Sequence, residues 1–331
     1  MELIRKPCQP SLCPQPGREE RPVTVGLVQH RWHTNADRHR TAIAEGVALA
    51  ASGGASVVFL PELTLSRYPA DALPDGRADR TAESLVGGPT HQLASELARD
   101  NDVLVHASLF QESGAADGRG LNTAIVVDTN GAIIAATHKL HIPVTAGYYE
   151  DHYFAEGPSE DPYPVHNLPL DSGALAVGLP TCWDEWFPEV PRSYALGGAE
   201  LLCYPTAIGS EPDFPAFDTQ PLLRQVVVGH AIANGLFIAV PNRFGSEGLI
   251  SFYGSSFIVD PFGRVLAEAP PDCECALVVD IDLAQRNDWL TLFPFFATRR
   301  PETYTALTHS RRNPRQADGT GLAGGIPGLD P

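Results

Sequence analysis

Short apolar runs alternate with amphipathic segments along most of the chain. Runs rich in β-branched and aliphatic residues predict strands, whereas apolar positions spaced three and four apart predict helices. In the first half, strands are expected at 23–29, 56–60 and 103–109, and helices at 37–51 and 89–100. This alternation is typical of an α/β fold.

The middle of the chain also carries a signal for antiparallel pairing. Strand-like runs at 121–128 and 132–138 are joined by Thr129-Asn130-Gly131, and Asn-Gly between apolar runs predicts a β-hairpin. The second half repeats the alternation, with strands expected at 174–179, 201–204, 236–240, 255–260, 265–269 and 275–282 and helices at 189–196 and 222–234. A mixed sheet covered by helices on one face must bury its other apolar face. We therefore expect two stacked sheets.

The two ends of the chain lack this patterning. Residues 1–20 are rich in proline and charge without an apolar period, which predicts a poorly ordered extension. The 331 residues would permit one or two domains, but no linker-like segment interrupts 21–308. We expect one domain with a large core at 21–308, followed by a flexible or oligomer-contacting tail at 309–331.

Charge and cysteine usage narrow the class of protein. The formal net charge is −17, from 23 Lys+Arg against 40 Asp+Glu, which disfavours nucleic acid and anionic membranes and favours a cationic small substrate. Six cysteines without repeated spacing, and no signal-peptide pattern, predict a reducing, cytoplasmic setting. Polar residues interrupt the longest apolar stretch, 222–240, so we expect no membrane span.

The richest local signal for chemistry is Cys182, which directly follows an apolar strand and precedes a helix. At such a turn, backbone N–H groups point toward whatever the sulfur attacks, and the positive end of the helix favours the thiolate. A lone cysteine is more often a small core residue. The interpretation of Cys182 as a nucleophile therefore needs support from other segments.

Two further charged residues follow predicted strands. Glu62 comes directly after a buried strand, where a carboxylate could act as a general base. Lys139 ends the second hairpin strand, and its ammonium could hold the charge that develops on an attacked carbonyl oxygen. Considered separately, each is more often an ordinary charge at the end of a strand.

Together, Glu62, Lys139 and Cys182 resemble the Glu-Lys-Cys triad of the nitrilase, or carbon–nitrogen hydrolase, superfamily. The likeness covers most of residues 23–308. It extends to the local strings at 25–29, 60–63, 147–150, 182–189, 204–212 and 252–257. The last three strings most resemble the N-carbamoylputrescine amidase branch. The resemblance implies a four-layer αββα sandwich, with two stacked mixed sheets flanked by helices, and a homo-oligomer.

The resemblance also implies a role for each residue. Glu62 would take the proton of Cys182, whose sulfur would attack a ureido or amide carbon and form a thioester-like intermediate. Lys139 and the backbone N–H of Trp183 would stabilise the oxyanion, and ammonia would leave. Glu150 is a fourth catalytic candidate, which would position the substrate or Lys139.

The predicted substrate contacts are Glu211, Trp183 and Tyr149. Glu211 lies where enzymes of the resembled branch meet the distal amine of the substrate, although a solvated loop carboxylate is the alternative. The scheme needs no metal and no organic cofactor. The sequence Cys273-Glu274-Cys275 is too closely spaced for a zinc site and has no second cysteine pair.

Several features depart from the family pattern. His138 stands where an arginine is usual, Thr181 stands where an aliphatic residue is usual, and Pro191 enters the helix after the cysteine. The segment 242–251 is also shorter than its counterpart in plant-type enzymes of the branch. These differences leave the triad intact and bear on the pocket.

The sequence leaves several functions open. N-carbamoylputrescine is the leading substrate, and another linear amide or an N-carbamoyl amino acid, including one from specialised metabolism, is the alternative. A true nitrilase is less favoured. From another class, the chain could be an ammonia-supplying subunit or a non-hydrolytic interaction protein on the same scaffold, and the intact site residues argue against the latter.

Overall fold

The computed structural model describes residues 1–309, and the chain divides into two compact units, Met1–Phe293 and the part from Pro294 onward. Residues 294–309 contain only two short 3-10 helices, Pro301–Thr303 and Thr305–Thr308, with no buried residue. The first unit therefore ends at residue 293 rather than at the predicted 308. Of the tail predicted at 309–331, all but His309 lies outside the described residues.

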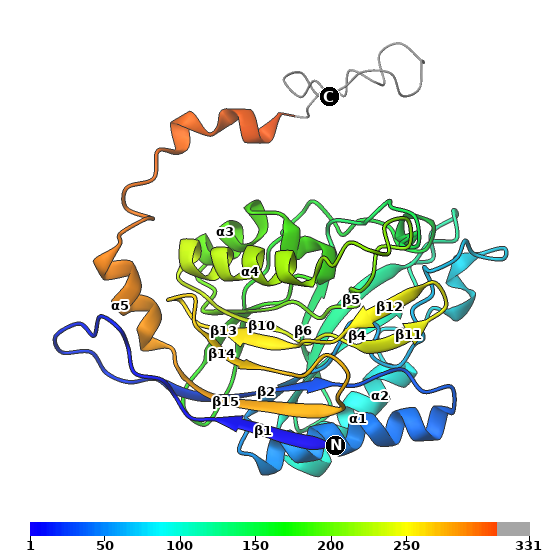
Figure 1. Cartoon of the computed structure of the whole chain (residues 1–331), viewed down its shortest axis with the longest axis horizontal. Helices are drawn as coiled ribbons and strands as arrows, with labels where there is room; N and C mark the ends of the chain where they lie inside the picture. Colours follow the sequence, from blue (N-terminus) through cyan, green and yellow to red (C-terminus); the bar gives the residue numbers. More distant parts are fainter. Residues whose placement is uncertain (310–331) are drawn as a thin grey trace. The chain divides into compact units, whose positions relative to one another are not determined.

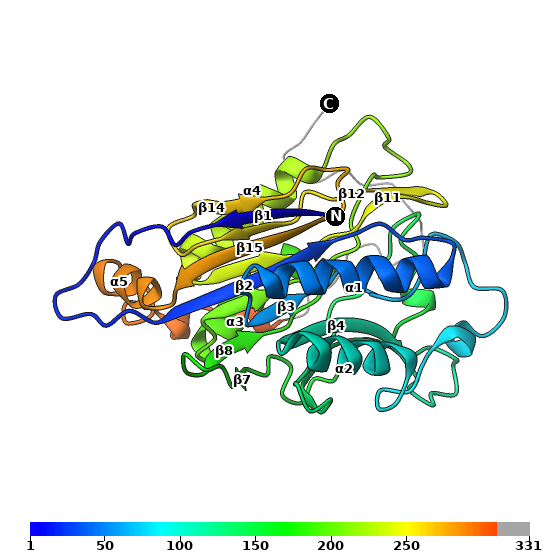
Figure 2. The ribbon, with the colours of Figure 1, turned by 90° about the horizontal axis from the view of Figure 1, so that it is seen from below.

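One sheet of the first unit has seven strands in the order β1-β15-β2-β3-β4-β5-β6 (Figure 1). Their bounds are β1 Glu2–Lys6, β15 Cys275–Asp282, β2 Pro22–Gln29, β3 Val57–Phe59, β4 Leu104–Gln111, β5 Leu121–Val127 and β6 Ile133–His138. Strands β2, β3 and β4 run parallel, whereas β5 and β6 add an antiparallel meander. Helices α1 (Ala36–Ser52) and α2 (Pro89–Asn101) lie along the outer face (Figure 2).

The second sheet has six strands in the order β14-β13-β10-β9-β8-β7. Their bounds are β14 Val265–Glu268, β13 Phe257–Val259, β10 Phe237–Val240, β9 Leu201–Cys203, β8 Leu175–Gly178 and β7 His166–Leu168. Helices α3 (Glu189–Leu196) and α4 (Gln220–Asn234) flank this sheet, and α5 (Ala284–Leu292) follows β15. The predicted αββα sandwich is confirmed.

Alternation along the strands explains how both faces of the first sheet are buried. In β2, Val25 and Leu27 join a core cluster that also contains Val177 and Ile258 of the second sheet. Val28, which follows Leu27, joins a second cluster with residues of α1 and α2. Because successive side chains of a strand point to opposite faces, one apolar strand supplies both the core between the sheets and the core beneath the helices.

The amino-terminal segment differs from the predicted poorly ordered extension. Strand β1 pairs in parallel with β15 over five residues. The Arg5 guanidinium donates to both oxygens of Asp280 at 2.9 and 3.0 Å, and the backbone N–H of Gln15 donates to Asp288 at 3.0 Å. These long-range partners are invisible to a local pattern, which shows only a segment rich in charge and proline.

The sequence also gave no indication of a small hairpin formed by β11 (Phe244–Glu247) and β12 (Ile250–Tyr253). This hairpin makes up its own two-stranded sheet. Three 3-10 helices complete the unit, at Ala78–Thr81, Glu150–His152 and Cys182–Trp186. Among the described residues, no helix combines the length and apolar character needed to cross a membrane.

Candidate active site

Strand ends bring the predicted acid and base residues together. Glu62 lies three residues after β3, and Lys139 directly follows β6, which runs in the same direction as β3. Glu150 begins the 3-10 helix at 150–152, and Cys182 begins the one at 182–186, beyond β8. All four side chains are buried. The structure therefore gathers residues separated by as much as 120 positions into one polar cluster inside an apolar core.

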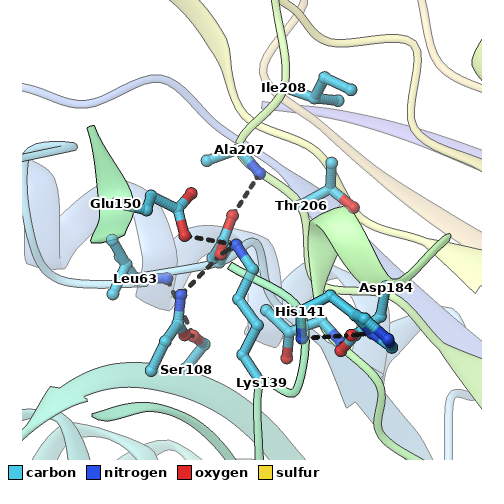
Figure 3. A network of polar contacts seen from close by, with 12 residues as sticks. Leu63, Ser108, Lys139, His141, Glu150, Asp184, Thr206, Ala207 and Ile208 are labelled. Atoms are coloured by element: carbon cyan, nitrogen blue, oxygen red, sulfur yellow. Dashed lines mark hydrogen bonds and ion pairs between the residues drawn. The ribbon is translucent and has the colours of Figure 1, made fainter. Parts of the chain in front are cut away.

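The Glu62 carboxylate is fully buried and accepts hydrogen bonds from three directions. One oxygen accepts from Asn122 Nδ2 at 2.7 Å and from Lys139 Nζ at 2.9 Å, and the other accepts from the backbone N–H of Ala207 at 2.9 Å. Figure 3 shows Lys139 and Ala207 directed into this network. Three donors fix the carboxylate in one orientation. A general base needs such a fixed position, because it must lie within hydrogen-bond distance of the proton that it takes.

Lys139 lies between two carboxylates. Its Nζ donates to Glu62 at 2.9 Å and to Glu150 at 2.6 Å (Figure 3). Burial opposes the charge on the ammonium, but Glu150 and Glu62 outweigh it and raise the pKa of Lys139 well above its usual range. Lys139 is therefore a fixed positive charge, able to stabilise a developing oxyanion.

The Glu150 carboxyl has a pKa near neutral pH. Burial is the main cause that raises the pKa of Glu150 to about 7; Lys139 opposes the rise and Glu62 adds to it. The other Glu150 oxygen accepts from the Tyr68 hydroxyl at 2.8 Å, a contact that favours the ionised carboxylate. Sequence analysis missed Tyr68 because it lies on a loop without a pattern of its own.

Cys182 adopts a backbone conformation that disfavours most side chains. Its φ of +46° lies in the left-handed region, and its backbone N–H donates to the carbonyl of Pro205 at 3.0 Å. The thiol lies within electrostatic range of Glu62, Lys139 and Glu150. A non-glycine residue held in this region at a reactive position is a feature of functional sites.

The predicted thiolate stabilised by a helix is wrong for the resting site. Burial, and then Glu62, raise the pKa of the Cys182 thiol well above its usual range, and Lys139 only partly offsets them. The segment after Cys182 is a 3-10 helix of five residues, too short to supply a full helix dipole. The sulfur therefore rests as a neutral thiol and needs a base to become a nucleophile.

Asp184 connects the turn at Cys182 to the loop that follows Lys139. Its buried carboxylate accepts from the backbone N–H of Thr181 at 3.0 Å, and from the backbone N–H and Nδ1 of His141 at 3.0 and 2.7 Å. Figure 3 shows Asp184 and His141 facing one another beside Lys139. Asp184 thus joins the turn at Cys182 to the loop after Lys139, a contact that its place in the motif did not indicate.

Glu185 is another carboxyl near Cys182 that the sequence did not single out. It is fully buried, and it lies within electrostatic range of Cys182. The Thr206 hydroxyl lies beside it, in an arrangement outside ordinary hydrogen-bond geometry. Burial, and then Glu62, raise its pKa well above the usual range, so the group is a neutral acid.

The predicted substrate contacts line a less buried region. Trp183, Tyr149 and Glu211 are all partly exposed, and burial raises the pKa of Glu211. The Tyr148 hydroxyl lies within electrostatic range of both Glu211 and Cys182. The Tyr148 hydroxyl is therefore the group that both Glu211 and Cys182 influence.

The departures from the family pattern are accommodated without disturbing this cluster. The His138 ring contacts the Thr123 hydroxyl at 2.9 Å, away from the carboxylates. Pro191 is the third residue of α3, within the first turn, where a missing N–H costs no helical hydrogen bond. The segment 242–251 contains the hairpin of β11 and β12.

Comparison with known proteins agrees with the fold. The family model described as carbon-nitrogen hydrolase matches residues 24–290. The crystal structure of a carbon-nitrogen hydrolase from Helicobacter pylori G27 has a TM-score of 0.75 at 30% identity, covering 87% of this chain and 99% of that chain. An amidase from Nesterenkonia sp. shares the fold, with a TM-score of 0.68, 24% identity, and coverage of 89% and 98%.

The chain belongs to the carbon–nitrogen hydrolase family, within the nitrilase superfamily. It is 34% identical over 289 residues to the citrullinase of Francisella tularensis, covering 86% of this chain and 98% of that protein. It is 33% identical over 299 residues to the N-carbamoylputrescine amidase of Arabidopsis thaliana, covering 87% and 95%. The predicted proximity to that branch is confirmed, and the chain is an amidohydrolase acting on non-peptide carbon–nitrogen bonds.

Proposed function

We propose that this enzyme hydrolyses a terminal ureido or primary amide group through a covalent intermediate on Cys182. The observation that carries the proposal is the buried ammonium of Lys139, held between the Glu62 and Glu150 carboxylates at 2.9 and 2.6 Å, within electrostatic range of a buried thiol. This arrangement supplies an acceptor for the thiol proton and a fixed cation for the oxyanion.

In the first half of the reaction, Glu62 takes the proton from Cys182 as the sulfur bonds to the carbonyl carbon. The negative charge that develops on oxygen is held by Lys139 and by the backbone N–H of Trp183. This N–H is near the start of a short helix, where the first amides have no intrahelical acceptor. Glu62 then returns the proton to the leaving nitrogen, and ammonia departs.

In the second half, Glu62 takes a proton from water, which attacks the same carbon and displaces the sulfur. A ureido substrate gives a carbamate, which loses carbon dioxide to leave an amine. Glu150 keeps Lys139 in place between the two steps, since its carboxylate accepts the second hydrogen bond of the ammonium.

A cationic ureido compound is the substrate class that we favour, with N-carbamoylputrescine as its leading member. Its support is the partly buried Glu211, which like Cys182 lies within electrostatic range of the Tyr148 hydroxyl, and the net charge of −17. Trp183 and Tyr149 would cover the aliphatic part of the substrate. A ureido amino acid is the second candidate, because the citrullinase relative is as similar as the amidase relative.

Ammonia release from a panel of substrates tests the proposal. The panel contains N-carbamoylputrescine, citrulline, N-carbamoyl-β-alanine, an ω-amide and a simple nitrile, each run beside Cys182→Ala. Release from the cationic ureido compound alone, abolished in Cys182→Ala, supports both the chemistry and the substrate class. Release from another amide would replace the substrate and keep the mechanism, and full activity of Cys182→Ala would refute the mechanism.

We further propose a reducing, cytoplasmic setting and self-association. All six cysteines are free thiols, which fits a reducing compartment. Exposed Phe214, Phe217 and Leu222 are large apolar side chains available to a second copy. Light scattering gives the oligomeric state. An ammonia-supplying subunit would instead release ammonia only in the presence of a partner, and a non-hydrolytic scaffold would release none.

A further inference from the structure

Arg243 is the largest of the fully buried side chains among the described residues. It directly precedes β11, and its guanidinium forms an ion pair with Glu247 at the end of the same strand, with contacts of 2.8 and 3.0 Å to the two carboxylate oxygens. Glu247 is buried as well. The β11–β12 hairpin therefore places a paired positive and negative charge inside the protein.

The guanidinium holds the loop that carries the general base. Its second terminal nitrogen donates to the backbone carbonyls of Glu62, Leu63 and Ser66 at 2.9, 2.9 and 3.1 Å. Leu63 has a φ of +49°, a left-handed conformation that disfavours residues with a Cβ. Three carbonyls directed at one guanidinium provide the compensation that lets the loop keep this conformation.

The partner carboxylate reaches the other side of the catalytic cluster. Glu247 accepts a hydrogen bond from the backbone N–H of Tyr68 at 2.8 Å, and the hydroxyl of Tyr68 donates to Glu150 at 2.8 Å. One ion pair thus contacts the backbone of Glu62 and the backbone of the residue that orients Glu150.

Stability alone is a poor explanation for this pair. Well-packed apolar residues of similar volume often replace a buried ion pair with no loss of stability, because desolvation cancels much of the attraction. The planar fork of an arginine, in contrast, can satisfy several acceptors in a fixed geometry. The arrangement is therefore suited to fixing the backbone of Glu62, Leu63, Ser66 and Tyr68.

We propose that Arg243 and Glu247 are positioning residues that set the Glu62 and Glu150 carboxylates relative to Cys182. The hairpin of β11 and β12 then determines the rate of the chemical step, although it supplies no reacting group. This inference rests on the proposed roles of Glu62 and Cys182, and it assigns a function to a segment that the sequence marked only as short.

The test compares Arg243→Lys with Arg264→Lys. Arg264 forms a matched pair with Asp260, also four residues apart, in which the carboxylate is buried, and neither residue touches the catalytic cluster. Lysine keeps the charge of arginine and loses the fork. We expect Arg243→Lys to lower kcat about 100-fold with KM within about threefold, because a displacement of about 1 Å in a catalytic group can cost that factor. Arg264→Lys should retain wild-type kcat.

A second readout is independent of the substrate. Iodoacetamide alkylation of Cys182, followed by mass spectrometry, reports how well Glu62 accepts the thiol proton. We expect the alkylation rate in Arg243→Lys to fall at least about tenfold at pH 7.5, since a misplaced base leaves the thiol neutral. This measurement tests the positioning role even if the wild type releases ammonia from no substrate of the panel.

The double variant Arg243→Met/Glu247→Leu covers the case in which Arg243→Lys does not fold. It removes both charges and leaves none unpaired, so we expect a folded protein that remains slow in hydrolysis and alkylation. The proposal is overturned if either variant is folded and keeps both kcat and the alkylation rate within threefold of the wild type.

Discussion

The proposed active site has a base side, around Glu62 and Leu63, and a nucleophile side, around Cys182. Different interactions hold the backbone on the two sides. Each contains a non-glycine residue in the left-handed region, Leu63 beside the base and Cys182 itself. The loop of Leu63 is held by the buried charges of Arg243 and Glu247. The turn of Cys182 is held by Asp184, through hydrogen bonds to backbone N–H groups and to His141.

This difference has a physical consequence. Removing one member of a buried ion pair leaves the other as an uncompensated charge, so the base side should fail abruptly. The nucleophile side relies on several separate hydrogen bonds to one carboxylate, each contributing about 1 kcal/mol, so it should weaken in steps. The two sides can therefore be distinguished by measuring kcat and the free energy of unfolding in variants of each side.

The largest effect is expected from Glu62→Gln on the base side. All three partners of Glu62 are donors, so the amide nitrogen of glutamine would face another donor, and the proton acceptor would be lost. We expect kcat to fall by about 10³–10⁴. Ammonia release measures kcat, and circular dichroism checks the fold. Retention of more than a tenth of wild-type kcat would show that another group accepts the proton.

Asp184→Asn examines the nucleophile side. The amide nitrogen would face a backbone N–H, and we expect a stability loss of about 1–3 kcal/mol. Because the remaining oxygen still accepts hydrogen bonds, kcat should fall only about 10–100-fold, less than in Glu62→Gln. Denaturant unfolding and kcat are measured on the same sample. A loss of kcat as large as that of Glu62→Gln would contradict the stepwise behaviour.

Tyr68→Phe tests the base side through the pH dependence of the activity. The pKa of Glu150 is raised to about 7, so the carboxylate is protonated, and stops accepting fully from Lys139, as the pH falls through that value. Activity should therefore decline on the acid side. The Tyr68 hydroxyl lowers the Glu150 pKa, so its removal should move the acid limb upward by about 0.5–1 pH unit. The measurement is kcat/KM between pH 5.5 and 9, and a limb that moves downward would disprove the assignment.

Glu185→Gln should have the smallest effect. Burial already keeps the Glu185 carboxyl neutral, so an amide of the same shape changes neither its charge nor its volume. We expect kcat to stay within about threefold of the wild type. Stopped-time ammonia assays at pH 7.5 suffice. A loss beyond about 30-fold would mean that Glu185 works in its ionised form.

Local patterns predicted most strands and both long helices that pack on the first sheet. Elements such as β2 and α1 can be predicted in this way because their apolar positions recur at a regular spacing within one continuous segment. Local patterns offered Glu62, Lys139 and Cys182 only as separate candidates after predicted strands, and the resemblance to the family joined them into one predicted site. The patterns could not find Tyr68, Asn122 or Arg243, whose relevance arises only from contacts across 60 residues or more. The partners of Glu62 come from three different parts of the chain, and no spacing rule connects them.

The strand at the amino terminus has a consequence for handling the protein. Strand β1 occupies the edge of the seven-stranded sheet beside β15, whose sequence from Cys275 to Asp282 is almost entirely apolar at its centre. Removing β1 would expose the backbone groups of β15 as a template for strand addition and aggregation. Glu2, Arg5 and Lys6 place charges along the outermost strand instead, which discourages such growth. Trimming this segment to obtain a shorter protein would therefore reduce its solubility.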